Sequence, residues 1–395
     1  MDNKTFKDKL MISSSMLQIT MILILLVLLI ISLTNLRNFR KLGNYPSPDH
    51  YPFVSILVPA RNEEGKISSC INSLLAQNYP DFEIIVLLDH SKDRTENILQ
   101  EIAAKNKRLR ILTGKPLPSV WLGKHWACHQ LAQAAKGELL LFTDADTVHK
   151  PDSLRESVAA MIAENADLLT ALPKEKVSSL SEKIILPLMP FGVSSILPIK
   201  IAHSVKSPLL SITIGQFMLF RRKAYEKIGG YSAVRDNIAD DMAMGRRIKA
   251  NGLRLFLVDG SEYISCHMYD NYSQISEGFS KNLFTVFGCK VIPYILIWVS
   301  IALIFLNPLS NLILKIAGVY VSGESIKLSI AAIFLTILLF GNAYKRFNYP
   351  LIYILFYPIC VSLWFIMAMN SMILTILGKT TWKGRRLIKP VVRWF

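Results

Sequence analysis

The chain has 395 residues, which is more than one typical domain, so at least two structural units are expected. Its formal net charge is +16, but many basic residues flank apolar blocks, where they would meet anionic lipid headgroups. Zinc-finger and RNA-binding signatures are absent from the sequence, so nucleic acid is not an expected partner. The 5 cysteines are scattered without a CxxC pair, which argues against a disulfide framework and against a structural zinc site.

Apolar residues make up 51% of the chain, and the excess lies near its two ends. The first apolar block, residues 17–33, is long enough for a membrane span of about 20 residues. A secretory signal peptide is the alternative, since lysines precede the block. However, Arg37, Arg40 and Lys41 stand where a small-residue cleavage site would be expected. We therefore predict a retained transmembrane anchor over residues 1–40.

The middle of the chain alternates short apolar runs with helix-like stretches over residues 53–260. Runs such as FVSILV, FEIIVLL and ELLLF predict buried strands, and amphipathic stretches follow them. This alternation is typical of an α/β domain with a mainly parallel sheet. We assign residues 41–288 to this domain.

Polar side chains cluster where these predicted strands end. In open α/β sheets, ligands bind outside the carboxyl ends of the strands. A single acidic loop is often only a turn or a helix cap, but three consecutive strand ends that carry acids favour a ligand site. The side chains concerned are Arg61, Asn62, Glu63, Asp89, Asp93, Asp144 and Asp146.

The last of these strand ends carries an Asp-x-Asp pair, Asp144 and Asp146. Their side chains project from alternate positions, so one carboxylate can face a metal ion while the other holds hydroxyl groups. Hard oxygen ligands suit Mg²⁺ or Mn²⁺, which keep several waters and bridge to substrate phosphates. The pair therefore predicts a site for a divalent cation beside a phosphorylated ligand.

Several segments resemble, in order and spacing, the motifs of glycosyltransferase family 2. They are VPARNEE (58–64), the strand-end Asp89, LLLFTDADT (139–147), GQFMLFRRKAYEKIGGY (215–231) and ADDMAMGRRIKANG (239–252). Further segments resemble a narrower group, the diaponeurosporenoate-type membrane glycosyltransferases of hopanoid and carotenoid pathways. These segments are SVWLGKHWACHQLA (119–132), EGFSKNL (277–283) and WKGRRL (382–387).

The resemblance implies a GT-A fold, a UDP-sugar donor with glucose as the expected sugar, a lipid acceptor, and Mg²⁺ or Mn²⁺. It assigns the uracil ring to Asp89, the ribose or the sugar to Asp144, and the metal to Asp146. Lys124 opens a predicted helix after a glycine, which suits a phosphate or ribose contact. The loop residues expected to hold the nucleoside are Pro59, Arg61 and Glu63.

Asp241 corresponds to the family's acidic general base, and Asp240 stands beside it. The pair begins an amphipathic helix that Gly252 ends, so one acid could be only the N-cap, which leaves the other to act. Because an unperturbed Asp has a pKa of about 3.9, it is mostly ionised near neutrality and could take the proton of an attacking hydroxyl. One displacement without an enzyme nucleophile would invert the anomeric configuration.

The Gln-x-x-Arg-Trp motif of processive polysaccharide synthases is absent from the sequence, which favours the transfer of a single sugar. His267 is a candidate third metal ligand, although a lone histidine is more often structural and imidazole suits transition metals better than Mg²⁺. Two alternatives stay open. One is a polyisoprenyl-phosphate sugar synthase or a polysaccharide synthase, and the other is a catalytically inactive membrane scaffold.

The second apolar region, within residues 289–395, predicts two or three spans followed by a basic tail. Three spans would place that tail opposite the catalytic domain, against the positive-inside tendency. Residues 184–201 are also apolar, but three prolines argue against a straight span, so we expect a segment in the interface with membrane lipids. We expect a multi-pass protein of the plasma membrane with its catalytic domain in the cytoplasm.

Overall fold

A twisted seven-stranded sheet forms the centre of the catalytic domain in the computed structural model, which describes residues 3–382, 385–387 and 389–395. Six strands run parallel, and β8 is the antiparallel one, as expected for a mainly parallel sheet. The strands lie in the order β3 (Leu109–Thr113), β2 (Phe82–Leu88), β1 (Val54–Ala60), β4 (Leu139–Thr143), β8 (Phe217–Arg221), β6 (Leu168–Leu172) and β9 (Leu255–Asp259).

Helices cover both faces of this sheet because its central strands are apolar on both sides. One face packs against α2 (Ile67–Leu75), α3 (Thr95–Ala103) and α5 (Ser153–Ala163). The other packs against α4 (Gly123–Ala134), α9 (Arg222–Lys227), η2 (Gly230–Val234) and α10 (Asp240–Ala250). A small sheet of β5 (Thr147–His149), β10 (Ile264–Cys266) and β7 (Lys174–Glu175) lies beside the end of β4.

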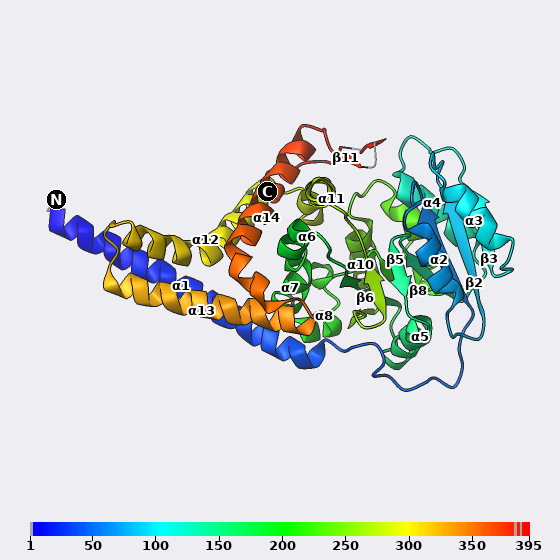
Figure 1. Ribbon diagram of the computed structural model, residues 1–395, viewed down its shortest axis with the longest axis horizontal. Helices are drawn as coiled ribbons and strands as arrows, with labels where there is room; N and C mark the ends of the chain where they lie inside the picture. Colours follow the sequence, from blue (N-terminus) through cyan, green and yellow to red (C-terminus); the bar gives the residue numbers. More distant parts are fainter. Residues whose placement is uncertain (1–2, 383–384, 388) are drawn as a thin grey trace.

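Among the described residues, four segments are long and apolar enough to span a membrane: Ser15–Asn38, Val291–Ile316, Gly323–Arg346 and Leu351–Ile376. They correspond to α1 (Asn3–Asn38), α12 (Val291–Ile316), α13 (Gly323–Arg346), and α14 (Tyr357–Ile376) with the short η3 (Leu351–Phe356) before it. Figure 1 shows α1, α12 and α13 running away from the catalytic domain together, whereas α14 lies across their base, between them and that domain.

Short helices connect the catalytic domain to this bundle. They are α6 (Leu180–Ile185), α7 (Leu188–Ser195), α8 (Ile199–Ser204), the turn η1 (Pro208–Leu210) and the longer α11 (Tyr272–Val286). Pro187 and Pro198 stand directly before α7 and α8 and divide this segment into short helices, so it is not one straight span. Asn35 at the end of α1 donates hydrogen bonds to the carbonyl oxygens of Ser194 and Leu197, so this segment packs directly on the anchor helix.

A buried ion pair holds the end of α13 against the sheet. Arg346 Nη2 lies 2.8 Å from Asp259 Oδ2 at the end of β9, and both side chains are almost completely buried. The same guanidinium donates to the carbonyl oxygen of Phe39, just after α1. Two membrane helices therefore meet the catalytic domain at one point.

The chain after α14 turns back towards the catalytic domain. Strands β11 (Thr381–Trp382) and β12 (Arg385–Arg386) pair antiparallel, and residues near the C-terminus bond to the start of α12 through Arg393 and Trp394 carbonyl oxygens. In this tail, residues 379–395, the described parts are thus bonded to each other and to the start of α12.

Candidate active site

Three neighbouring parallel strands, β1, β2 and β4, end at the same edge of the sheet and deliver the predicted polar residues there. The backbone N–H of Asp89 donates to the carbonyl oxygen of Ala60, which ties the first two strand ends together. Asp93 has a structural role in the second loop, since its carboxylate accepts from Thr95 and from the backbone N–H of Glu64. The loop that contains Pro59, Arg61 and Glu63 is thereby fixed against the end of β2.

Asp89, the residue expected to read the base, faces two arginines. Arg385 of the C-terminal tail donates to both carboxylate oxygens, at 2.8 Å and 3.4 Å, and Arg61 lies 3.5 Å away. Gly123 at the start of α4 lies against this ion pair. A side chain at position 123 would collide with Arg385 and approach Asp89. Two cations on one carboxylate leave this corner of the site with a net positive charge, which favours an anionic ligand.

Lys124 connects this corner to the Asp-x-Asp pair. Its Nζ lies 2.6 Å from Asp144 Oδ1. Although burial by itself would lower it, the carboxylates of Asp144 and Asp240 raise the pKa of Lys124 well above its ordinary value. Because the adjacent His125 lies 3.7 Å from Asp240, the start of α4 brings the strand-end and helix-start carboxylates together.

Asp146, like Asp144, is half-buried at the end of β4. Burial, together with the charges of Asp144 and Glu63, raises the pKa of Asp146 to about 6. A carboxyl group with an elevated pKa among other acids is one that a bound cation would stabilise in its ionised form.

The groups around Asp146 differ from a complete metal cage. Cys266 Sγ lies 3.4 Å from Asp146 Oδ1, and the backbone N–H of His267 donates to the Asp146 carbonyl oxygen. The His267 ring lies 3.7 Å from both Glu182 and Asp270. Within the described residues no group of three or more His, Cys, Asp and Glu side chains could hold a metal ion. Asp146 and Asp144 fit a hard cation of the Mg²⁺ type, which takes one or two protein carboxylates and completes its shell with water and phosphate oxygens.

Asp240 and Asp241 open α10, and Ala239 is the residue before the helix, so neither acid is the N-cap. The carboxylate of Asp241 accepts backbone hydrogen bonds from Gly215 at 3.2 Å and from Met242 at 2.6 Å. Burial and the charge of Asp240 nevertheless raise the pKa of Asp241 to about 6. The group is thus oriented, ionised at neutral pH and more basic than an ordinary Asp.

Asp240 differs from its neighbour. His125 Nε2 lies 3.7 Å from Asp240 Oδ1, while Oδ2 is buried without a hydrogen-bond partner among the described residues. Although burial alone would raise it, His125 and Lys124 hold the pKa of Asp240 below its ordinary value. Asp240 therefore stays charged and raises the basicity of Asp241.

Two residues of this site were not predicted individually, Lys281 on α11 and Arg385 in the tail. Lys281 lies under Trp382, with Nζ 4.0 Å from the centre of a ring, and close enough to Asp240 and Asp241 for their charges to affect its pKa. Burial lowers the pKa of Lys281 to about 8. Both residues lie in segments that resemble the narrower group, EGFSKNL and WKGRRL. The sequence therefore pointed to these segments, but it did not assign a role to either residue.

The sequence was compared with protein-family models and with curated proteins. The family model described as "Glycosyl transferase family 2" matches residues 55–229. Among curated proteins, a 4,4'-diaponeurosporenoate glycosyltransferase of Staphylococcus haemolyticus is 25% identical over 234 residues, which is 58% of this chain and 60% of the relative. The protein of the same name from Staphylococcus aureus (strain USA300) is 24% identical over 62% of this chain and 65% of its own length. The chain thus matches less than two thirds of these relatives.

Among solved structures, the fold is similar to that of a mannosyltransferase from Pyrobaculum calidifontis, solved in complex with GDP-Man and Mn²⁺. That similarity has a TM-score of 0.58 at 17% sequence identity and covers 91% of this chain and 99% of the other. It extends over the membrane helices as well as the sheet. Residues 55–229 therefore resemble a glycosyl transferase family 2 domain, and the fold of the chain is of the GT-A type.

Proposed function

We propose that the protein is an inverting, non-processive glycosyltransferase that moves a sugar from a nucleoside-diphosphate sugar to a lipid hydroxyl at the membrane. The observation that carries the proposal is the convergence of Asp144 and Asp240 on the start of α4, through Lys124 and His125, with Asp241 oriented beside them. This arrangement supplies a base on one side and a charged donor pocket on the other. The names of the curated relatives support a carotenoid-type lipid as acceptor; those names give a carboxylate, whereas a base at Asp241 calls for a hydroxyl acceptor here.

The donor half consists of the strand-end residues. Asp89 would accept from the base, the loop of Pro59, Arg61 and Glu63 would enclose the nucleoside, and Lys124 with Asp144 would contact the ribose and the phosphates. UDP is the nucleotide that the motif resemblance favours, with glucose as the sugar. Asp146, with Asp144, would hold Mg²⁺ or Mn²⁺, and that cation would neutralise the charge of the diphosphate when both are bound.

The chemical step follows from the position of Asp241. The acceptor oxygen forms a bond to the anomeric carbon as the bond between that carbon and the diphosphate oxygen breaks, and the nucleoside diphosphate leaves with the electron pair. The acceptor proton passes to the carboxylate of Asp241. Gly215 and Met242 hold this carboxylate in place through their backbone N–H groups. Because no covalent enzyme intermediate forms, the product has the inverted configuration.

The domain organisation supports a membrane-bound acceptor. We assign residues 1–40 to an anchor, residues 41–288 to the catalytic domain and residues 289–395 to a second membrane region. The segment 184–201 packs on the anchor, and exposed apolar side chains such as Ile196 and Ile201 stand near its end beside Lys200. We propose that this segment lies among lipid headgroups, in the plasma membrane, with the catalytic domain facing cytoplasmic nucleotide sugars.

A transfer assay with the full-length protein tests the proposal. The protein in detergent receives radiolabelled UDP-glucose or GDP-mannose, total lipid extract and Mg²⁺ or Mn²⁺, and labelled lipid is separated by chromatography. The expected result is an acid-stable glycolipid that Asp241→Asn does not form. An acid-labile, phosphate-linked product would support the polyisoprenyl-phosphate alternative instead. If neither donor were bound, transferred or hydrolysed, the inactive scaffold would be the better hypothesis.

A further inference from the structure

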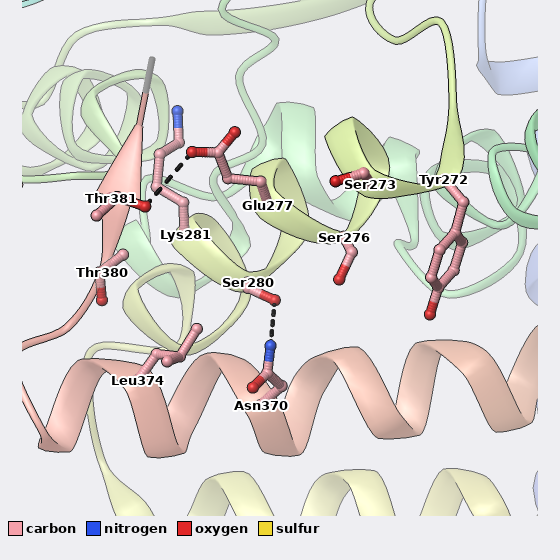
Figure 2. A pocket seen from close by; sticks show the side chains of 10 residues that line it. All are labelled: Tyr272, Ser273, Ser276, Glu277, Ser280, Lys281, Asn370, Leu374, Thr380 and Thr381. Atoms are coloured by element: carbon pink, nitrogen blue, oxygen red, sulfur yellow. Dashed lines mark hydrogen bonds between the residues drawn. The ribbon is translucent and has the colours of Figure 1, made fainter. Parts of the chain in front are cut away.

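A cavity of about 360 Å³ lies between α11, α14 and the start of the tail, and Figure 2 shows the side chains that line it. This volume is within the usual range of small-molecule sites. Ser280 and Asn370 form its floor, where Asn370 Nδ2 donates to Ser280 Oγ at 2.9 Å. Thr381 closes one side by donating to Glu277 at 3.4 Å. The wall therefore combines groups from the catalytic domain, from a membrane helix and from the tail.

The lining contains polar groups that a ligand would satisfy. Thr380 is 5% exposed, lines the cavity, and has a hydroxyl group without a hydrogen-bond partner among the described residues. Asn370 stands within an apolar helix, where a polar side chain is costly unless it has a function. A buried hydroxyl and an amide at the same cavity point to a ligand that offers hydrogen-bonding groups.

Lys281 belongs both to the cavity wall and to the surroundings of the reaction centre. This lysine lines the cavity and also lies close enough to Asp144, Asp240 and Asp241 to interact with their charges. Arg246 of α10 donates to the carbonyl oxygen of Val286, so the helix of the proposed base packs on the helix that forms the cavity wall. A group bound in the cavity would therefore lie against the helix that contacts α10, the helix of Asp241.

The position of the tail places this cavity at the membrane surface. Helix α12 leaves the catalytic domain at Val291. Helix α13 ends beside that domain again, because Arg346 at its end pairs with Asp259. The two helices therefore start and end on the same side. The contact of Arg385 with Asp89 shows that the chain is on that same side after α14. A helix that begins and ends on one side does not cross the bilayer, so α14 lies in the interface.

The outer face of α14 agrees with this position. Ile359, Ile366 and Ile373 are exposed, and their spacing of seven places them on one side of the helix. The opposite side packs on α11 through residues such as Trp364 and Met367. α14 is apolar over most of its length, so its exposed outer face suits the headgroup and acyl boundary while α11 covers its inner face. The cavity on its inner side is then at the depth of lipid headgroups.

Resting on the proposed function, we infer that this cavity is the acceptor site and that it takes the uncharged, hydroxyl-bearing head group of a lipid. The charged side chains among its described lining residues are one acid, Glu277, and one base, Lys281, which give no net charge. A phosphate head group would need several arginine or lysine donors, and Asp240 and Asp241 beyond Lys281 would repel it. Hydroxyl and amide groups match a neutral alcohol instead.

Photocrosslinking of the full-length protein in nanodiscs, without donor, tests the site. The probes are a photoreactive diacylglycerol, which is neutral and has one hydroxyl, and phosphatidic acid with the same acyl chains. The expected result is crosslinking of the diacylglycerol to peptides of α11 and α14, at least tenfold above that of phosphatidic acid. Ser276→Trp, which fills the cavity, should reduce this yield at least tenfold, and Asn370→Leu should reduce it without adding bulk.

Thr34→Trp is the matched control, because it adds the same side chain at an exposed position of α1 and should leave the yield unchanged. Binding of UDP or GDP, measured by calorimetry, reports whether each variant is folded. Equal labelling by phosphatidic acid, or labelling that Ser276→Trp and Asn370→Leu leave intact, would overturn the inference. A protein that binds the lipid but no nucleoside diphosphate would contradict the proposed function and leave the cavity assignment standing.

Discussion

The donor half and the acceptor half of the site are built in different ways. In the donor half, Asp89, Asp144 and Asp146 each follow a buried strand directly, and neighbouring strands bring them together. In the acceptor half, the contributing groups come from α11, α14 and the tail, and the link between the halves joins residues 296 positions apart, Asp89 and Arg385. The first half depends on local strand geometry, whereas the second depends on how the membrane helices pack.

The largest expected effect separates chemistry from donor binding. Asp241→Asn keeps the shape of the side chain but removes the base, so kcat should fall by about 100- to 10,000-fold, the usual contribution of general-base catalysis. The affinity for UDP or GDP, measured by calorimetry, should change little because Asp241 lies on the acceptor side. Asp236→Asn is the control, since Asp236 is exposed on the same connection before α10. Retention of full turnover by Asp241→Asn would rule out the assigned base.

The junction between the two halves should be sensitive to the buried pair of Arg346 and Asp259. Arg346→Met leaves an uncompensated buried carboxylate, so the free energy of unfolding should fall by about 3 kcal/mol or more. Urea unfolding in detergent micelles measures the change. Arg40→Met is the matched control, because Arg40 pairs with Glu164 while 59% exposed, and such surface pairs contribute about 0–1 kcal/mol. Equal effects of the two substitutions would mean that the buried pair does not hold the bundle.

Sequence patterns predicted the donor half more completely than the acceptor half, for physical reasons. Strand β2 was predicted with its observed bounds, since a continuous apolar run between turn residues determines both ends. The mainly parallel sheet and the placement of Lys124 at the start of α4 also follow the pattern. These features depend on residues that are close in the sequence.

The acceptor half could not be predicted in the same detail. The apolar run that contains α14 has the length and hydropathy of a membrane span, and composition alone does not distinguish a crossing helix from one in the interface. The contact between Arg385 and Asp89 determines on which side of the membrane the tail lies. This contact depends on tertiary packing over most of the chain. Roles for Lys281 and Arg385 could not be assigned without that packing.

The contact between Arg385 and Asp89, which joins the two halves, should increase the affinity for the donor. Arg385→Gln removes one of the two cations from Asp89, so this corner loses its net positive charge and the affinity for UDP or GDP should fall about tenfold. The affinity for uridine or guanosine, which lack phosphates, should fall less. Arg386→Gln is the neighbouring control, because the Arg386 guanidinium bonds to the carbonyl oxygen of Gly378 instead. If Arg385→Gln left the nucleotide affinity unchanged, the role of Arg385 would be only to hold the tail against Asp89.

The topology of the tail can be tested with labelled cysteines, because the five native cysteines are buried. Lys389→Cys in the tail and Lys107→Cys in the catalytic domain, both exposed, should react with a membrane-impermeant maleimide from the same side of sealed vesicles. Reaction from opposite sides would show that α14 crosses the membrane and that the cavity is not at the surface assigned to it.

The smallest expected effect is a shift in the pH dependence of the acceptor half. Burial and Asp240 raise the pKa of Asp241 to about 6, and the base must be deprotonated to act, so kcat should rise with pH through about 6 and level off above 7. Asp240→Asn removes the neighbouring negative charge, which favours the ionised form of Asp241 and moves the midpoint to lower pH. Because burial is the larger cause of the shift, the midpoint should stay above the ordinary value for Asp. A midpoint that Asp240→Asn raised would mean that another group controls the reaction.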